Sequence, residues 1–116
     1  MKTIMVVDDE FDLLTVWRLL LEAEGYHVVT ASNGAVALQL VRQARPDLIF
    51  SDCVMPIMTG PELCANLYQD SQLRDIPVIL CSSASRIPPQ ANPVIVYQRK
   101  PVRPDVLKSL LKKMLS

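Results

Sequence analysis

Short apolar runs alternate with longer amphipathic segments along the whole chain. Residues 4–7 are continuously apolar and stop at the acids 8–10, as expected for a strand that is buried on both faces. From 12 to 24 polar residues recur every three or four positions, which predicts an amphipathic helix that ends at Gly25. The same alternation predicts later strands at 27–31, 47–50, 77–81 and 94–97, and later helices at 33–45, 61–69 and 105–115.

The order of these elements indicates the fold class. Strands that alternate with helices of this length form a parallel sheet, and right-handed crossovers place helices on both of its faces. We therefore expect an α/β, doubly wound fold. The connection 84–93 differs because Pro88, Pro89 and Pro93 each remove an amide donor and disfavour helix in the preceding residue. The fourth helix is predicted to be short or absent.

Composition narrows the class of protein. The length of 116 residues suits one domain, which we expect to span 1–116. Because the formal net charge is zero, no overall field favours direct binding to nucleic acid or to an acidic membrane surface. No segment approaches the roughly 20 apolar residues of a membrane span. Cys53, Cys64 and Cys81 lack metal-binding spacing and are interpreted as reduced thiols, so a cytoplasmic location is expected.

Candidate chemistry lies at the predicted strand ends. In a parallel sheet of order 2-1-3-4-5, the functional crevice lies where the first and third strands end, and those ends carry Asp8, Asp9 and Asp52. Each close pair of carboxylates costs on the order of 4 kcal/mol at an effective dielectric of about 20, so the cluster requires positive charge. Mg²⁺ and Lys100 could supply it, and Ser82 adds a hydroxyl. Such a neutral pocket could accept a phosphoryl group.

Each of these residues also has an ordinary structural interpretation. Asp8 and Asp9 are favoured at a helix start by the helix dipole. Asp52 alone would be a turn acid, Ser82 a loop hydroxyl and Lys100 a surface cation. Their conjunction at the ends of four different predicted strands favours the functional interpretation, because those ends lie on the same edge of a parallel sheet.

Four motifs together resemble those of response-regulator receiver domains. They are VVDDE at 6–10, DLIFSDCVMPIMTGPEL at 47–63, PVILCSSA at 77–84 and KP at 100–101, and they occur in the family's order. The resemblance, which extends to the single-domain chemotaxis regulator of bacteria, implies a flavodoxin-like sheet of five parallel strands in the order 2-1-3-4-5. It also implies a role in two-component signalling or a phosphorelay.

The resemblance implies a role for each acid. Asp52 would accept a phosphoryl group from a histidine kinase or a histidine phosphotransferase. Asp9, Asp52 and the backbone carbonyl of Val54 would bind Mg²⁺ directly, and Asp8 would bind it through water. The chain would then be a phosphoacceptor that at most removes its own phosphoryl group, rather than an enzyme that turns over external substrate.

A further set of residues would transmit the modification. By resemblance, Lys100 would pair with phosphoryl oxygens, Ser82 would move onto one of them, and Tyr97 would turn inward afterwards. The signal would pass to a downstream protein or a fused output domain, or through a phosphorylation-dependent dimer. The proline-bearing segment 84–93 departs from the family at the face that often carries this output.

Two other functions are compatible with a sheet of this kind. A phosphotransfer or hydrolytic enzyme with an aspartyl intermediate typically has Asp-x-Asp after its first strand, whereas this chain has the adjacent pair Asp8-Asp9. A receiver-like interaction module that works without phosphorylation typically lacks an acid, the hydroxyl or the lysine, and this chain retains all of them. Both alternatives are therefore less favoured.

The first helix should have distinct inner and outer residues. The residues expected to pack on the sheet are Val16, Trp17, Leu20 and Leu21. Leu13 and Leu14 lie one turn beyond the acids, and we expect them to be partly exposed, where they could dock a partner helix. Core packing explains these two leucines nearly as well.

Overall fold

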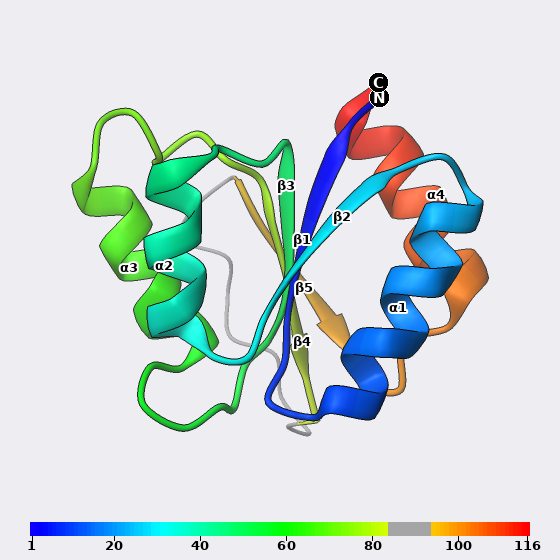
Figure 1. Ribbon diagram of the computed structural model, residues 1–116, viewed down its shortest axis with the longest axis horizontal. Helices are drawn as coiled ribbons and strands as arrows, with labels where there is room; N and C mark the ends of the chain where they lie inside the picture. The colour runs from blue at the N-terminus through cyan, green and yellow to red at the C-terminus, as the bar shows by residue number, and fades with distance from the viewer. Residues whose placement is uncertain (84–93) are drawn as a thin grey trace.

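The computed structural model describes residues 1–83 and 94–116 and contains a five-stranded parallel sheet. The strands are arranged in the order β2-β1-β3-β4-β5, which confirms the expected flavodoxin-like topology (Figure 1). Their bounds are β1 Thr3–Val7, β2 His27–Ala31, β3 Leu48–Asp52, β4 Val78–Ser82 and β5 Ile95–Arg99. The reversal of strand order beside β1 places the ends of β1 and β3 next to each other at the edge where such folds bind ligands.

Helices cover both faces of the sheet, as the alternating pattern predicts. Figure 1 shows α2 and α3 on one side of the sheet and α1 and α4 on the other. The helices in the described residues are α1 Phe11–Ala23, α2 Gly34–Gln43, α3 Gly60–Gln69 and α4 Pro104–Leu115. Each face has its own apolar core, one under α2 and α3 and the other under α1 and α4. The predicted lack of a fourth helix concerns residues 84–93, which lie outside the described residues.

Local structure explains where two of the helices begin and where α1 ends. The Asn33 side chain accepts a hydrogen bond from the Val36 amide at 3.0 Å and caps α2. Thr59 and Glu62 form a capping box at the start of α3, in which each side chain accepts from the other residue's backbone amide. Gly25, with a φ of 95°, ends the turn after α1 in a conformation that favours glycine.

The outward face of α1 differs from the sequence prediction. Val16 is 49% exposed, and the large apolar side chains Phe11 and Leu19 are also exposed, whereas Leu14 is buried. The expected packing of Val16 and the expected exposure of Leu14 are therefore wrong. The helix directs Leu14, Trp17 and Leu21 toward the sheet, at the spacing of three and four residues that shares one helical face.

In residues 1–83 and 94–116, none of the helices combines the length and the apolar composition that crossing a membrane requires.

Candidate functional site

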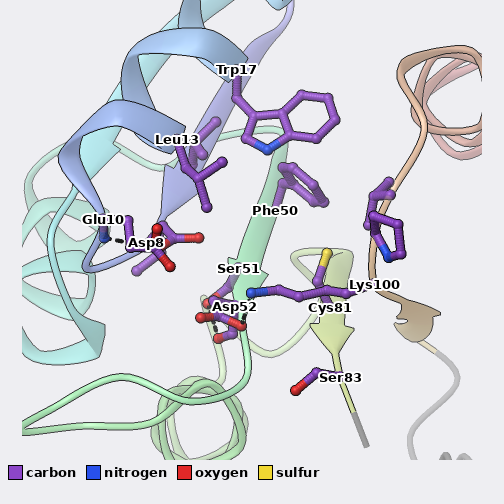
Figure 2. Close-up of a pocket in the computed structure, with 14 residues that line it drawn as sticks. Asp8, Glu10, Leu13, Trp17, Phe50, Ser51, Asp52, Cys81, Ser83 and Lys100 are labelled. Atoms are coloured by element: carbon purple, nitrogen blue, oxygen red, sulfur yellow. Dashed lines mark hydrogen bonds and ion pairs between the residues drawn. The ribbon is translucent and has the colours of Figure 1, made fainter.

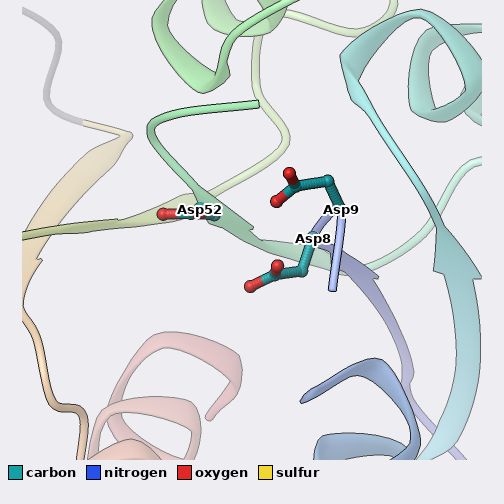
Figure 3. Close-up of side chains that lie close together, drawn as sticks. All are labelled: Asp8, Asp9 and Asp52. Atoms are coloured by element: carbon teal, nitrogen blue, oxygen red, sulfur yellow. The ribbon is translucent and has the colours of Figure 1, made fainter. Parts of the chain in front are cut away.

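Three carboxylates meet at the carboxyl edge of the sheet. Asp8 and Asp9 follow β1, and Asp52 ends β3. One oxygen from each side chain lies within 4.8 Å of one oxygen from each of the others (Figure 3). The predicted convergence of the acids is therefore confirmed, and it follows from the pairing of β1 with β3 up to Val7 and Ser51.

The three acids have different environments. Asp8 is only 6% exposed, and its Oδ1 accepts a hydrogen bond of 2.9 Å from the backbone amide of Glu10. Burial raises the pKa of Asp8, and the negative charge of Asp52 raises it further. The hydrogen bond from the Glu10 amide lowers the pKa and offsets part of this increase. Asp9, by contrast, is exposed. When no cation is bound, a negative charge on the buried Asp8 therefore costs more free energy than a negative charge on the exposed Asp9.

Lys100 supplies positive charge to this cluster. Its Nζ lies 2.9 Å from Oδ1 of Asp52, and its backbone amide donates to the Ser82 carbonyl at 2.9 Å, which continues the pairing of β4 and β5. Burial would lower the pKa of Lys100, but the hydrogen bond and charge of Asp52, together with the charge of Asp8, raise it overall. The lysine is therefore fully charged at neutral pH and neutralises Asp52.

Ser82 and Tyr97 lie on the neighbouring strands. The Ser82 side chain is buried at the end of β4 and forms a hydrogen bond with the Cys53 thiol. Tyr97 is half-buried in β5 and packs, with Cys53, against the core under α2 and α3. Ser82 thus links the residue after Asp52 to the end of β4, and Tyr97 lies on the adjacent strand β5.

The donor set fits a hard divalent cation. Carboxylate oxygens are the ligands that Mg²⁺ prefers, and one or two carboxylates with water and phosphate oxygens complete its shell in typical sites. The thiols are poor competitors at neutral pH, since burial raises the pKa of Cys64 to about 12 and burial also raises the pKa of Cys53 and of Cys81. The three carboxylates are therefore the better ligands for a metal at this edge.

Comparison with known proteins identifies the family. The family model described as the response regulator receiver domain matches residues 4–112. The chain belongs to this family. The receiver domain is 42% identical over 78 residues to the polar-differentiation response regulator DivK of Brucella anthropi, a match that covers 67% of the chain and 63% of DivK.

Other relatives show the same domain in different settings. Histidine kinase P4 of Formosa agariphila is 40% identical over 86 residues, which are 74% of the chain but 6% of the kinase. The receiver domain thus spans less than two thirds of the length of these two relatives. The structure of the Vibrio cholerae chemotaxis protein CheY4 superposes with a TM-score of 0.88 at 29% identity and covers 98% of both chains. The similarity to known receivers therefore extends over the whole fold.

The loop after β3 holds Asp52 closely against α3. A side-chain carbon at Gly60 would lie 2.5 Å from the Asp52 carbonyl oxygen, and the Gly60 amide donates to the Cys53 carbonyl at 3.0 Å. Glycine is required here because any side chain would displace the end of β3. In the same loop Val54 is 74% exposed, and the binding of Mg²⁺ by its carbonyl stays a prediction.

A cavity of about 550 Å³, which the sequence pattern does not predict, lies beside the acids. Figure 2 shows Trp17, Leu13 and Phe50 along one part of it, with Asp52 and Lys100 at another. The rings of Trp17 and Phe50 make an edge-to-face contact with centroids 5.1 Å apart. In the sequence, the only sign of this cavity is that Leu13 and Trp17 are four residues apart and so share one helical face. Residues that pack in an ordinary core have the same spacing.

Proposed function

We propose that this receiver domain accepts a phosphoryl group on Asp52 from a histidine kinase or a histidine phosphotransferase, in a reaction that depends on Mg²⁺. The observation that carries the proposal is the joint position of Asp52 beside two further carboxylates and 2.9 Å from the Lys100 ammonium. A structural turn acid would require neither the additional acids nor the lysine.

The charges at the site suit phosphoryl transfer. The charges of Asp8, Asp9, Asp52 and Lys100 sum to minus two, so a divalent cation brings the pocket to neutrality. When bound, Mg²⁺ would neutralise carboxylate charge and stabilise the oxygens of the incoming phosphoryl group. Asp9 and Asp52 would hold it directly, and the buried Asp8, already bonded to the Glu10 amide, would act through water.

The chemical step requires a carboxylate nucleophile. A carboxylate oxygen of Asp52 would attack phosphorus while the phosphorus–nitrogen bond of the donor histidine breaks and its electron pair returns to the imidazole. The product is an acyl phosphate on Asp52. Lys100 would stabilise charge on the phosphoryl oxygens, which requires its ammonium to exchange part of its present contact with Asp52.

The modification would then be transmitted through Ser82 and Tyr97. The Ser82 hydroxyl, now bonded to Cys53, would move onto a phosphoryl oxygen, and Tyr97 would turn inward into the space beside it. The expected result is a changed surface for a downstream protein, a fused output domain or a second copy of the chain. The receiver would thus act as a regulatory module and not as an enzyme with external turnover.

Phosphorylation can be tested with small donors. Acetyl phosphate with Mg²⁺ should add one phosphoryl group, measured by mass spectrometry, and beryllofluoride with Mg²⁺ should change the fluorescence of Trp17, which lines the cavity shared with Asp52. Asp52→Asn should abolish both signals. Asp12→Asn, which removes an exposed acid from the first turn of α1, is the matched control and should retain both. A protein that binds Mg²⁺ but takes no label would instead favour an interaction module that works without phosphorylation.

A further inference from the structure

The cavity beside Asp52 combines apolar walls with an acidic end. Leu13 and Trp17 of α1, Phe50 of β3 and Val102 before α4 supply apolar surface, and Asp8 and Asp52 reach the same space (Figure 2). A volume of about 550 Å³ lies within the 300–1,000 Å³ that is typical of pockets for small organic molecules. Phosphoryl transfer makes no use of the apolar part, because a phosphoryl group and a hydrated cation are both polar.

The charge of the lining selects the kind of ligand. Asp8, Glu10 and Asp52 contribute three negative charges, and Lys100 contributes the one positive charge among the described lining residues. The Lys100 ammonium contacts Asp52 at 2.9 Å and its charge also acts on Asp8, so the described lining residues keep a net charge of minus two, at the end formed by Asp8, Glu10 and Asp52. An anionic ligand would be repelled from this end, whereas a cation would be attracted to it.

We propose that the cavity binds a small amphipathic amine, with its ammonium against Asp8 and its aromatic or branched apolar group against Trp17 and Phe50. The edge-to-face pair of Trp17 and Phe50 provides an aromatic wall that suits a ring, while the Asp8 carboxylate provides a charge-assisted hydrogen bond. The bound ammonium occupies the neighbourhood that a metal requires, so such an amine excludes Mg²⁺ and prevents phosphorylation. Only this last consequence rests on the proposed function.

Binding is tested first without metal. Calorimetric titration with 2-phenylethylamine should give saturable binding to one site, and the neutral 2-phenylethanol and the anionic 3-phenylpropanoate should bind at least about tenfold more weakly, because they lack the charge-assisted contact. Equal binding of the three compounds would identify a merely apolar groove and would refute the proposal. So would the absence of amine binding.

Matched variants test the location. Leu13→Trp fills the apolar part of the cavity and should weaken amine binding at least about tenfold, while Leu19→Trp places the same bulk on the exposed face of α1 and should leave the affinity unchanged. Leu19→Trp, which lies outside the cavity, should also still be labelled by acetyl phosphate. Equal amine affinity in the two variants would place the ligand elsewhere and overturn the assignment.

Competition tests the connection to the metal site. At a Mg²⁺ concentration ten times its dissociation constant, the apparent dissociation constant of 2-phenylethylamine should rise about tenfold, and the amine should slow labelling by acetyl phosphate in proportion to its occupancy. Amine binding that is indifferent to Mg²⁺ would contradict the shared position of the two cations. If the protein bound no Mg²⁺ at all, the proposed function would fail while the titration without metal would still decide the amine site.

Discussion

Replacing Asp8 with asparagine removes one of three negative charges that meet at the end of the sheet. The side-chain oxygens of the three acids lie within 4.8 Å of one another, and at an effective dielectric of about 20 each such pair repels by about 3.5 kcal/mol. The attraction between Asp8 and Lys100 is lost with the same substitution, while the asparagine oxygen can still accept the Glu10 amide. We therefore expect Asp8→Asn without metal to raise the free energy of unfolding at pH 7 by about 1–2 kcal/mol.

The dependence on pH follows from the raised pKa of Asp8. Because the folded protein holds this proton more tightly than the unfolded chain does, the wild type loses stability as pH rises from the ordinary aspartate pKa through the raised value. The loss is complete above the raised pKa. The advantage of Asp8→Asn should therefore be largest above the raised pKa of Asp8 and should shrink as the solution is acidified through that range.

Saturating Mg²⁺ should reverse the difference in stability between Asp8→Asn and the wild type. A ligand at 100 times its dissociation constant stabilises the folded state by about 2.7 kcal/mol, and Asp8→Asn should lose much of that gain because its metal affinity falls. Thermal unfolding followed by circular dichroism measures both conditions, and for a domain of this size 1 kcal/mol corresponds to about 4 °C in Tm. Asp9→Asn, in which an exposed acid is changed, should raise the Tm less in EDTA.

Two outcomes for the Asp8→Asn variant would contradict these expectations. If Asp8→Asn lowered the Tm in EDTA, repulsion among the three acids would not destabilise the metal-free fold, and an equal shift with and without Mg²⁺ would contradict the proposed role of Asp8 in binding the metal. Chemical denaturation at pH 7 provides an independent value of the free energy of unfolding for the same comparison.

Two further substitutions test the loop between β3 and α3. Ile57 is 82% exposed and has a φ of 71°, so Ile57→Asn should raise the free energy of unfolding by about 1 kcal/mol in denaturant titration, whereas Ile57→Val should not. Gly60→Ala should lower the free energy of unfolding by at least about 2 kcal/mol and slow the labelling of Asp52, because the added carbon meets the Asp52 carbonyl. Gly25→Ala is the control: Gly25 has open space around it, so this variant should lose only about 1 kcal/mol of stability and should be labelled normally.

The pattern of apolar runs was sufficient to predict the parallel sheet and the convergence of the acids. Strand ends in a parallel sheet share an edge, so residues that follow β1 and β3 are neighbours however their side chains pack. The second strand has the predicted bounds, whereas the last three begin one residue later and end one or two residues later than predicted. β3 continues to Asp52 and β4 to Ser82, since the ladder persists in the bond from the Cys53 amide to the Cys81 carbonyl.

The orientation of α1 depended on tertiary packing. Seven of the nine residues from 13 to 21 are apolar, so several helical faces could have been buried with similar gain. Contact with the sheet selects Leu14, Trp17 and Leu21 and leaves Val16 and Leu19 exposed. Periodicity identifies an amphipathic helix, but it does not resolve its rotation when the apolar arc is this wide.

Sequence alone thus determined which chemical groups gather at the carboxyl edge of the sheet, because strand order and chain direction require it. Tertiary structure decided how those groups differ: it buries Asp8 and exposes Asp9, joins Lys100 to Asp52, and opens a cavity beneath Trp17. These properties depend on the sizes and positions of side chains from distant parts of the chain, and no local pattern contains that information.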